Sequence, residues 1–338
     1  TKGTSTNWYL GRSNGSLYSL NIPDPLSITQ TWTNAVITAS IKDLNYDASE
    51  KLLTIAANRS ATQELSFYDF NKSLLSSRDM TGTLAVNSAM KYGAFVYAGS
   101  SVTTAELQVV RALGDSWASP TVSGVFNAPS TTDATRSFVS GTTAYVALNK
   151  TAAGPELYIV NVLNPDAPAL LSALEINENV SDVWVNGDYA YLSTAGDAKE
   201  MVVVDVSDKA HPSVVGTVDL PTAADGLSIV GDAAINQVFV GTANNTTGPG
   251  YELYGIDVSG AKTTSSLTWS RVYNANGAVY DLDFDSDHKM IYLSTGYTTQ
   301  ELQVVDVSVA NVAVRVDAYN TANNTAYGVD YDPSTGNS

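Results

Sequence analysis

Glu200-Met-Val-Val-Val-Asp205 returns with variations along the whole chain. Each copy is a glutamate followed by a short apolar run, and many copies end in Asp or Asn. The other copies begin at Glu64, Glu106, Glu156, Glu252 and Glu301, and Ser16-Leu-Tyr-Ser-Leu-Asn21 matches without the glutamate. The second residue of the motif recurs every 42 to 52 residues, and the distance from the last copy round to the first is 53 residues. Seven copies at this period, with the last leading back to the first, are typical of β-propeller blades.

Each repeat contains four predicted strands, most clearly around Glu200. Strands A to D of this blade would be Val180–Asn186, Tyr189–Thr194, Met201–Val206 and Val214–Asp219. Asn186-Gly187 separates the first two runs, and Asn-Gly between alternating apolar runs is a strong hairpin signal. The third run is almost wholly apolar, as expected where neighbouring blades cover both faces of a strand. No stretch has a convincing helical period, so the predicted fold class is all-β.

The first and last repeats are incomplete in complementary ways. Trp8–Gly11, Leu17–Ile22 and Ile28–Thr33 supply strands B, C and D without a strand A. Tyr327–Asp332, followed by the turn Pro333-Ser-Thr-Gly336, supplies a strand A alone. We therefore predict a single domain, a seven-bladed propeller of four-stranded antiparallel blades, in which the C-terminal strand A completes the N-terminal blade and leaves no unpaired strand edge at the joint. The predicted blades are 325–338 with 1–33, 34–81, 82–127, 128–176, 177–220, 221–273 and 274–320.

Composition indicates an extracellular setting and excludes several kinds of chemistry. Acidic residues outnumber basic ones by 34 to 17, and a surface with a net charge of −17 repels nucleic acid. The absence of cysteine excludes thiol catalysis, disulfides and iron–sulfur clusters. No apolar run approaches the roughly 20 residues of a membrane span, so direct membrane insertion is not expected. The low lysine content and the Thr- and Asn-rich surface favour the cell surface. Thr1 follows no leader, so either a leader has been removed or the chain is a piece of a larger surface protein or filament.

A known family resembles the strongest repeats. Met201–Gly216, with its turn Asp205-Val-Ser-Asp-Lys-Ala-His-Pro212, resembles the LVIVD repeat of bacterial and archaeal surface propellers. Leu157–Leu171 is a second good match and Leu302–Val309 a partial one, whereas the first three repeats keep the strand and lose the Asp-Pro turn. The resemblance implies a propeller fold and a surface location, and it carries no catalytic motif.

The candidate site lies at the mouth of the central channel. The first residues of the A strands are expected to ring the axis at the face of the D–A and B–C loops, where binding sites collect. Alignment places Asp43, Ser88, Arg136, Asp182, Gly226, Asp281 and Gly328 in this ring. Its charged members would suit a polar ligand or a cation, with Asp43, Asp182 and Asp281 as ligands if calcium is bound. In the alternative, Arg136 pairs with Asp182 and water fills the rest. No other cofactor is expected.

Two further carboxylate patterns leave alternatives open. Asp281-Leu-Asp-Phe-Asp-Ser-Asp287 alternates carboxylates along one side of a strand, and calcium is a minor possibility there. The repeated glutamate could bond backbone amides of its own loop in every blade, which we favour, or form an acidic rim on the loop face. Trp8 and Trp184 are assigned to the core.

The few histidines limit the catalytic options. His211 and His288 are both predicted in turns on the face opposite the site, which excludes a Ser-His-Asp device or a multi-histidine metal site at the channel mouth. Asp182 and Asp281 could still serve a glycosidase or lyase. We expect a non-enzymatic surface module that binds a protein or glycan through its loop face, in adhesion or assembly. The alternative is a hydrolase or lactonase with calcium held by Asp43, Asp182 and Asp281.

Overall fold

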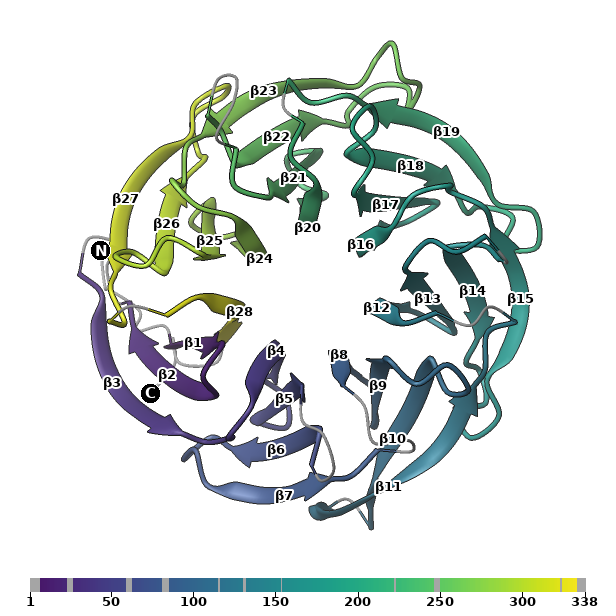
Figure 1. Cartoon of the computed structure of the whole chain (residues 1–338), viewed down its shortest axis with the longest axis vertical. Coiled ribbons are helices and arrows are strands. Elements are labelled where there is room, and N and C mark those ends of the chain that lie inside the picture. Colours follow the sequence, from purple (N-terminus) through teal and green to yellow (C-terminus); the bar gives the residue numbers. More distant parts are fainter. Residues whose placement is uncertain are drawn as a thin grey trace.

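Seven four-stranded antiparallel sheets surround a central axis, which confirms the predicted fold (Figure 1). The computed structural model describes residues 7–22, 27–58, 63–80, 85–114, 116–129, 132–152, 154–221, 223–245, 250–322 and 324–332. The predicted turn Pro333-Ser-Thr-Gly336 lies outside these residues. The described part of the chain contains no helix with the length and apolarity needed to cross a membrane.

The blades are numbered from the one that joins the two ends of the chain, with strands given from the axis outward. Blade 1 is β28 (Ala326–Asp332), β1 (Asn7–Arg12), β2 (Ser16–Asn21) and β3 (Thr29–Ala35). Blade 2 is β4 (Ser40–Asp47), β5 (Leu52–Asn58), β6 (Leu65–Asp69) and β7 (Leu74–Arg78). Blade 3 is β8 (Val86–Tyr92), β9 (Phe95–Ser100), β10 (Leu107–Leu113) and β11 (Ser116–Phe126). Blade 4 is β12 (Ala134–Ser140), β13 (Thr143–Leu148), β14 (Leu157–Asn161) and β15 (Ala169–Leu174).

The remaining blades follow the same order. Blade 5 is β16 (Val180–Asn186), β17 (Tyr189–Thr194), β18 (Met201–Asp205) and β19 (Ser213–Val218). Blade 6 is β20 (Gly226–Asp232), β21 (Gln237–Thr242), β22 (Leu253–Asp257) and β23 (Thr268–Tyr273). Blade 7 is β24 (Val279–Asp285), β25 (Met290–Thr295), β26 (Leu302–Asp306) and β27 (Val314–Tyr319). The core lies between blades, where apolar B and C strands of one sheet pack against the A and B strands of the next.

The two ends of the chain close the circle by pairing with each other. In blade 1, β28 runs antiparallel to β1, with Asn7 opposite Asp332 and Leu10 opposite Val329. Trp8 is fully buried at this joint and stacks between Tyr292 and Tyr331. The predicted pairing of strand A with the N-terminal strand is confirmed, as is the assignment of Trp8 to the core.

Every A strand carries one extra residue close to its N-terminal end. The register against the B strand shifts there in all seven blades, as in a β-bulge, which re-aims the side chains that follow. The bulged residues are Lys42, Asn87, Thr135, Ser181, Leu227, Tyr280 and Tyr327. In β20 the shift lies between Gly226 and Ser228, so the residue equivalent to Asp182 is Ser228. The alignment that placed Gly226 in the ring was wrong by two residues, because Gly226 is the equivalent of Val180 and precedes the bulge.

The repeated glutamate anchors the segment that follows strand D of its own blade. All six copies are buried, and one carboxylate oxygen of each accepts a backbone N–H from the segment after the D strand of the same blade. The donors lie 2.8 to 3.1 Å away and are Met80, Ala128, Ile176, Leu220, Ala275 and Thr321. The amide-bonding interpretation is confirmed, with the D–A segment in place of the B–C loop. The acidic-rim alternative is wrong, because the carboxylates are 0–1% exposed.

Candidate functional site

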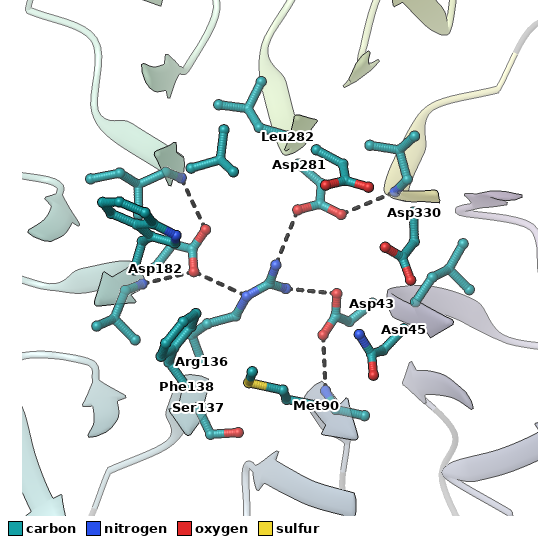
Figure 2. A pocket seen from close by; sticks show the side chains of 18 residues that line it. Asp43, Asn45, Met90, Arg136, Ser137, Phe138, Asp182, Asp281, Leu282 and Asp330 are labelled. Atoms are coloured by element: carbon teal, nitrogen blue, oxygen red, sulfur yellow. Dashed lines mark hydrogen bonds and ion pairs between the residues drawn. The ribbon is translucent and has the colours of Figure 1, made fainter. Parts of the chain in front are cut away.

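One arginine crosses the channel and pairs with three aspartates. Arg136 extends from β12 in blade 4 to carboxylates of three other blades (Figure 2). Its Nη1 lies 2.7 Å from Asp43 Oδ1, its Nε lies 3.0 Å from Asp182 Oδ1, and its Nη2 lies 3.1 Å from Asp281 Oδ1. The expected pair with Asp182 is present, and the same guanidinium also reaches the two aspartates on the far side. Arg136 therefore fills this level of the channel.

The second oxygen of each aspartate joins its blade to the next. Asp43 Oδ2 accepts the N–H of Ala89, Asp182 Oδ2 that of Ile229 and Asp281 Oδ2 that of Val329, at 2.9 to 3.0 Å. Ser88 has the equivalent position in blade 3, where its Oγ accepts the N–H of Ser137 at 3.0 Å. Ser88 is buried, and its Oγ also lies 3.4 Å from that of Ser137. The structure thus brings Asp43, Arg136, Asp182 and Asp281 together and places Ser88 between two blades.

Burial and charge oppose each other in this cluster. Burial disfavours the charge on Arg136, but Asp182, Asp43 and Asp281 outweigh it and raise the pKa of the guanidinium well above its usual value. Burial raises the pKa of Asp182, and it raises the pKa of Asp281 to about 8, although Arg136 works against both shifts. One guanidinium cannot neutralise three buried carboxylates, so the cluster contains more carboxyl groups than positive charges.

The three aspartates fit calcium poorly. Each has one oxygen on Arg136 and the other on a backbone N–H, so each oxygen already has a partner. Calcium takes six to eight oxygen ligands, and a guanidinium in their midst repels it. Within the described residues no group of three or more His, Cys, Asp or Glu is arranged to hold a metal ion. Of the alternating carboxylates, Asp285 instead accepts N–H groups of its own turn, from Asp287 and His288.

A cavity of about 260 Å³ lies along the channel at and beyond the guanidinium. Its inner wall comes from the residues two positions after the ring residues, because alternate side chains of a strand share a face. These are Asn45, Met90, Phe138, Trp184, Val230, Asp283 and Asp330, all half-buried. Figure 2 shows Asn45 and Asp330 on one side of Arg136, and Phe138 and Met90 on the other. The wall is therefore polar on one arc and apolar on the other.

The polar arc contains two carboxyl groups from adjacent blades whose charges act on each other. They belong to Asp283 of β24 and Asp330 of β28. Burial raises the pKa of Asp283 to about 6, and burial together with the charge of Asp283 raises the pKa of Asp330 well above its usual range. Asp330 also accepts the N–H of Tyr46. Both shifts favour the neutral form of these acids.

The bulged residues form a separate hollow at the mouth. A space of about 120 Å³ is lined by Lys42, Asn87, Thr135, Ser181, Leu227 and Tyr280, with Arg136 and Asp182 as its floor. The ring of Tyr280 meets that of Tyr327 edge to face at 4.7 Å, and Lys42 Nζ lies 5.3 Å from the centre of Tyr327. Within the described part of the chain, the hydroxyls of Ser181, Tyr280 and Tyr327 make no hydrogen bond to protein.

Sequence reasoning found Arg136 and its three aspartates, and it missed the hollow at the mouth and the inner cavity on either side of them. The assignment of Trp184 to the core was incomplete, since Trp184 lines the cavity. Asp283, Asp330 and Asn45 could have been found by continuing the period-two pattern from each ring residue into the strand. His211 and His288 lie in the β18–β19 and β24–β25 turns, as predicted, and each contacts an aspartate three residues before it.

Comparison with known proteins agrees with the fold. The chain is a seven-bladed β-propeller, and residues 178–220 match the LVIVD repeat, so the resemblance seen in blade 5 is confirmed there. Similar solved structures include a candidate 6-phosphogluconolactonase of Bacteroides fragilis, with a TM-score of 0.80, 12% identity and coverage of 98% of this chain and 99% of that chain. A Lactobacillus plantarum protein has a TM-score of 0.78 and 12% identity, and the match covers 97% of this chain and 99% of that chain.

A third similar structure is the periplasmic gluconolactonase of Pseudomonas aeruginosa, with a TM-score of 0.70, 12% identity and coverage of 97% of this chain and 99% of that chain. At these identities the likeness extends to the fold alone. No curated protein matches the chain in sequence.

Proposed function

We propose that the protein is a non-enzymatic module of the cell surface that binds a glycan through its loop face. The observation that carries this proposal is the double engagement of Asp43, Asp182 and Asp281. Each carboxylate is committed to Arg136 and to a backbone N–H, which leaves none of the three free as a base, nucleophile or metal ligand. The level of the channel nearest the mouth therefore serves structure.

The mouth supplies the groups that a sugar requires. Tyr280 and Ser181 line the hollow and bring one aromatic ring and two hydroxyl groups to it, and Tyr327 packs against Tyr280 edge to face. Ligand sites combine such aromatic surface with a few polar groups that fix orientation. The extracellular location is supported by the composition and by the LVIVD repeat of residues 178–220, which resembles those of surface propellers. Adhesion or assembly would follow from the binding of a neighbouring glycan.

A printed array of oligosaccharides, probed with the fluorescently labelled protein, tests the proposal. We expect binding to a restricted set of sugars, and an affinity at least tenfold weaker for Tyr280→Ala combined with Ser181→Ala. Trp269→Ala is the matched control, since Trp269 is an exposed aromatic residue on the outer strand β23 and should leave binding unchanged. Binding to no sugar, or equal binding by the mouth variant, would count against a glycan site.

The lactonase alternative has its own measurement. Hydrolysis of glucono-δ-lactone is followed with and without calcium, using the parent and the Asp43→Asn, Asp182→Asn, Asp281→Asn triple variant. We expect no turnover above the buffer rate from either protein. Calcium-dependent turnover that disappears in the triple variant would refute the non-enzymatic proposal.

A further inference from the structure

The inner level of the channel differs from the mouth in both charge and shape. Asn45, Asp283 and Asp330 occupy adjacent blades 2, 7 and 1, whereas Met90, Phe138, Trp184 and Val230 occupy blades 3 to 6. A pocket with carboxyl groups on one arc and aromatic and aliphatic groups on the other suits a ligand that has a charged end and an apolar body. The glycan site proposed above uses neither arc.

The charge of this space favours a cation. Five carboxyl groups line the cavity, those of Asp43, Asp182, Asp281, Asp283 and Asp330, against the single guanidinium of Arg136. Arg136 is bound to the first three, so the Asp283–Asp330 pair has no cationic partner among the residues that line the cavity. Burial raises the pKa of both carboxyl groups, the charge of Asp283 adds to the shift of Asp330, and an external cation can supply the positive charge that the pair lacks.

The apolar arc favours an organic cation over a metal ion. Trp184 and Phe138 present aromatic surface, and aromatic faces attract ammonium groups and pack against hydrocarbon. The arc supplies no oxygen ligand, whereas calcium needs oxygen ligands on every side.

Gly231 makes room for the indole of Trp184. A Cβ atom at Gly231 would lie 2.3 Å from Trp184 Cζ3. The glycine in β20 therefore lets the ring occupy its place in the channel wall.

From these features we infer that the inner cavity binds a small primary amine, with its ammonium group between Asp283 and Asp330 and its hydrocarbon body against Trp184 and Phe138. The ammonium donates hydrogen bonds to both carboxylates, and a proton that the raised pKa values retain on the pair passes to solvent. Asn45 lies beside Asp330, and its Oδ1 accepts the backbone N–H of Lys91 at 2.7 Å, so the third N–H of the ammonium is left to water. The cavity volume of about 260 Å³ limits the ligand to one small ring or a short chain.

Isothermal titration calorimetry with benzylamine tests this inference, with benzyl alcohol as the neutral probe of the same shape. We expect benzylamine to bind at one site and benzyl alcohol to bind at least tenfold more weakly. Titrations in two buffers with different heats of ionisation should show that protons are released on binding. Equal affinities for the two probes, or no binding of benzylamine, would overturn the inference.

Variants locate the site. Asp283→Asn and Asp330→Asn each remove one buried carboxyl group at constant size, and each should weaken benzylamine binding at least tenfold without lowering the melting temperature. Trp184→Ala should weaken it as well, and Asp208→Asn, in the exposed β18–β19 turn, is the control that should bind as the parent does. Unchanged binding in both channel aspartate variants would place the amine elsewhere and refute the assignment.

Discussion

Burying a guanidinium among three carboxylates costs every group its hydration, and the cost is offset only if nearly all charges and lone pairs find partners. Arg136 meets this condition through all three of its nitrogens, and each aspartate meets it with both oxygens. The side chain of Arg136 still retains 24% exposure, so it remains in contact with the channel. The cluster therefore holds four blades together at the axis and lies between the hollow at the mouth and the inner cavity.

The repeated glutamates are a second set of buried acids, and Glu200 is the most perturbed among them. Burial raises its pKa to about 7, and only one of its oxygens accepts a hydrogen bond, from Leu220. A carboxyl group with a raised folded-state pKa contributes its full stability below about pH 4.5, and the contribution is lost as the pH rises to about 7. Glu200 is therefore a source of instability at alkaline pH.

We predict that Glu200→Gln stabilises the protein by about 1–2 kcal/mol at pH 8 and has little effect at pH 4.5, where both side chains are neutral. The amide keeps the bond from Leu220 and can donate towards Asp219 or Asp197, whose charges act on Glu200. Urea unfolding at the two pH values measures the effect, with the exposed Asp166→Asn as a control. A variant less stable than the parent at pH 8 would show that the carboxylate charge is well compensated.

Sequence could predict those site residues that repeat at a fixed place in every blade. Asp43, Arg136, Asp182 and Asp281 begin equivalent strands, and the repeat finds them directly. Trp184, Asp283 and Asp330 form one wall only because different blades bring them together. The alternation of residues within one strand gives no information on contacts between strands of different blades. The cavity could therefore be recognised only in the structure.

Among the elements, strand positions were predictable to within one or two residues because apolar runs and turn dipeptides bound them. Gly187 is an example, since it has φ of +58° in the two-residue turn between β16 and β17, where a left-handed residue is required. The bulges were missed, because an extra residue in one strand leaves the pattern of apolar residues almost unchanged. In β20 no charged residue marks the ring position, because Ser228 stands where β16 has Asp182, and the alignment fell on Gly226 instead.

Outer strands approach the neighbouring blade so closely that two of them need glycine. A Cβ atom at Gly216 in β19 would lie 2.1 Å from the carbonyl oxygen of Lys262, and one at Gly124 in β11 would lie 2.1 Å from that of Pro165. Both oxygens belong to the segment between strands C and D of the next blade. Backbone cannot move aside as a flexible side chain does, so these contacts set the spacing between blades.

Gly216→Ala should therefore destabilise the protein by about 1–3 kcal/mol, the usual cost of overpacking. Thermal or urea unfolding monitored by circular dichroism measures the loss. Gly260→Ala provides the comparison, because no atom lies within 4 Å of its added Cβ and its stability should match the parent. If the two variants unfold alike, the close approach does not constrain blade spacing.

For the whole molecule, closure depends on a single strand. β28 supplies the inner strand of blade 1 and the backbone N–H of Val329 that binds Asp281. Without it, β1 and the apolar faces of blades 2 and 7 would lose their partners, and the circle would have an open edge.

A chain that ends at Ala326 should lose its sharp thermal transition, whereas a chain that ends at Asp332 should melt as the parent does. The comparison isolates β28 from the residues after it. Differential scanning calorimetry distinguishes a cooperative peak from a broad one. A shortened chain with the same sharp transition as the parent would refute closure by pairing of the two ends.

The antiparallel pairing of β28 with β1 also determines how the protein responds to tension. Asn7 lies opposite Asp332, so a force that pulls these two residues apart acts at one end of the ladder and opens its hydrogen bonds one after another. Force between residue 7 and the loop face instead loads the bonds of β1 together, as in shear. The propeller is therefore a weak link when it is stretched through both termini and a strong one when it is held by a single terminus and a bound partner.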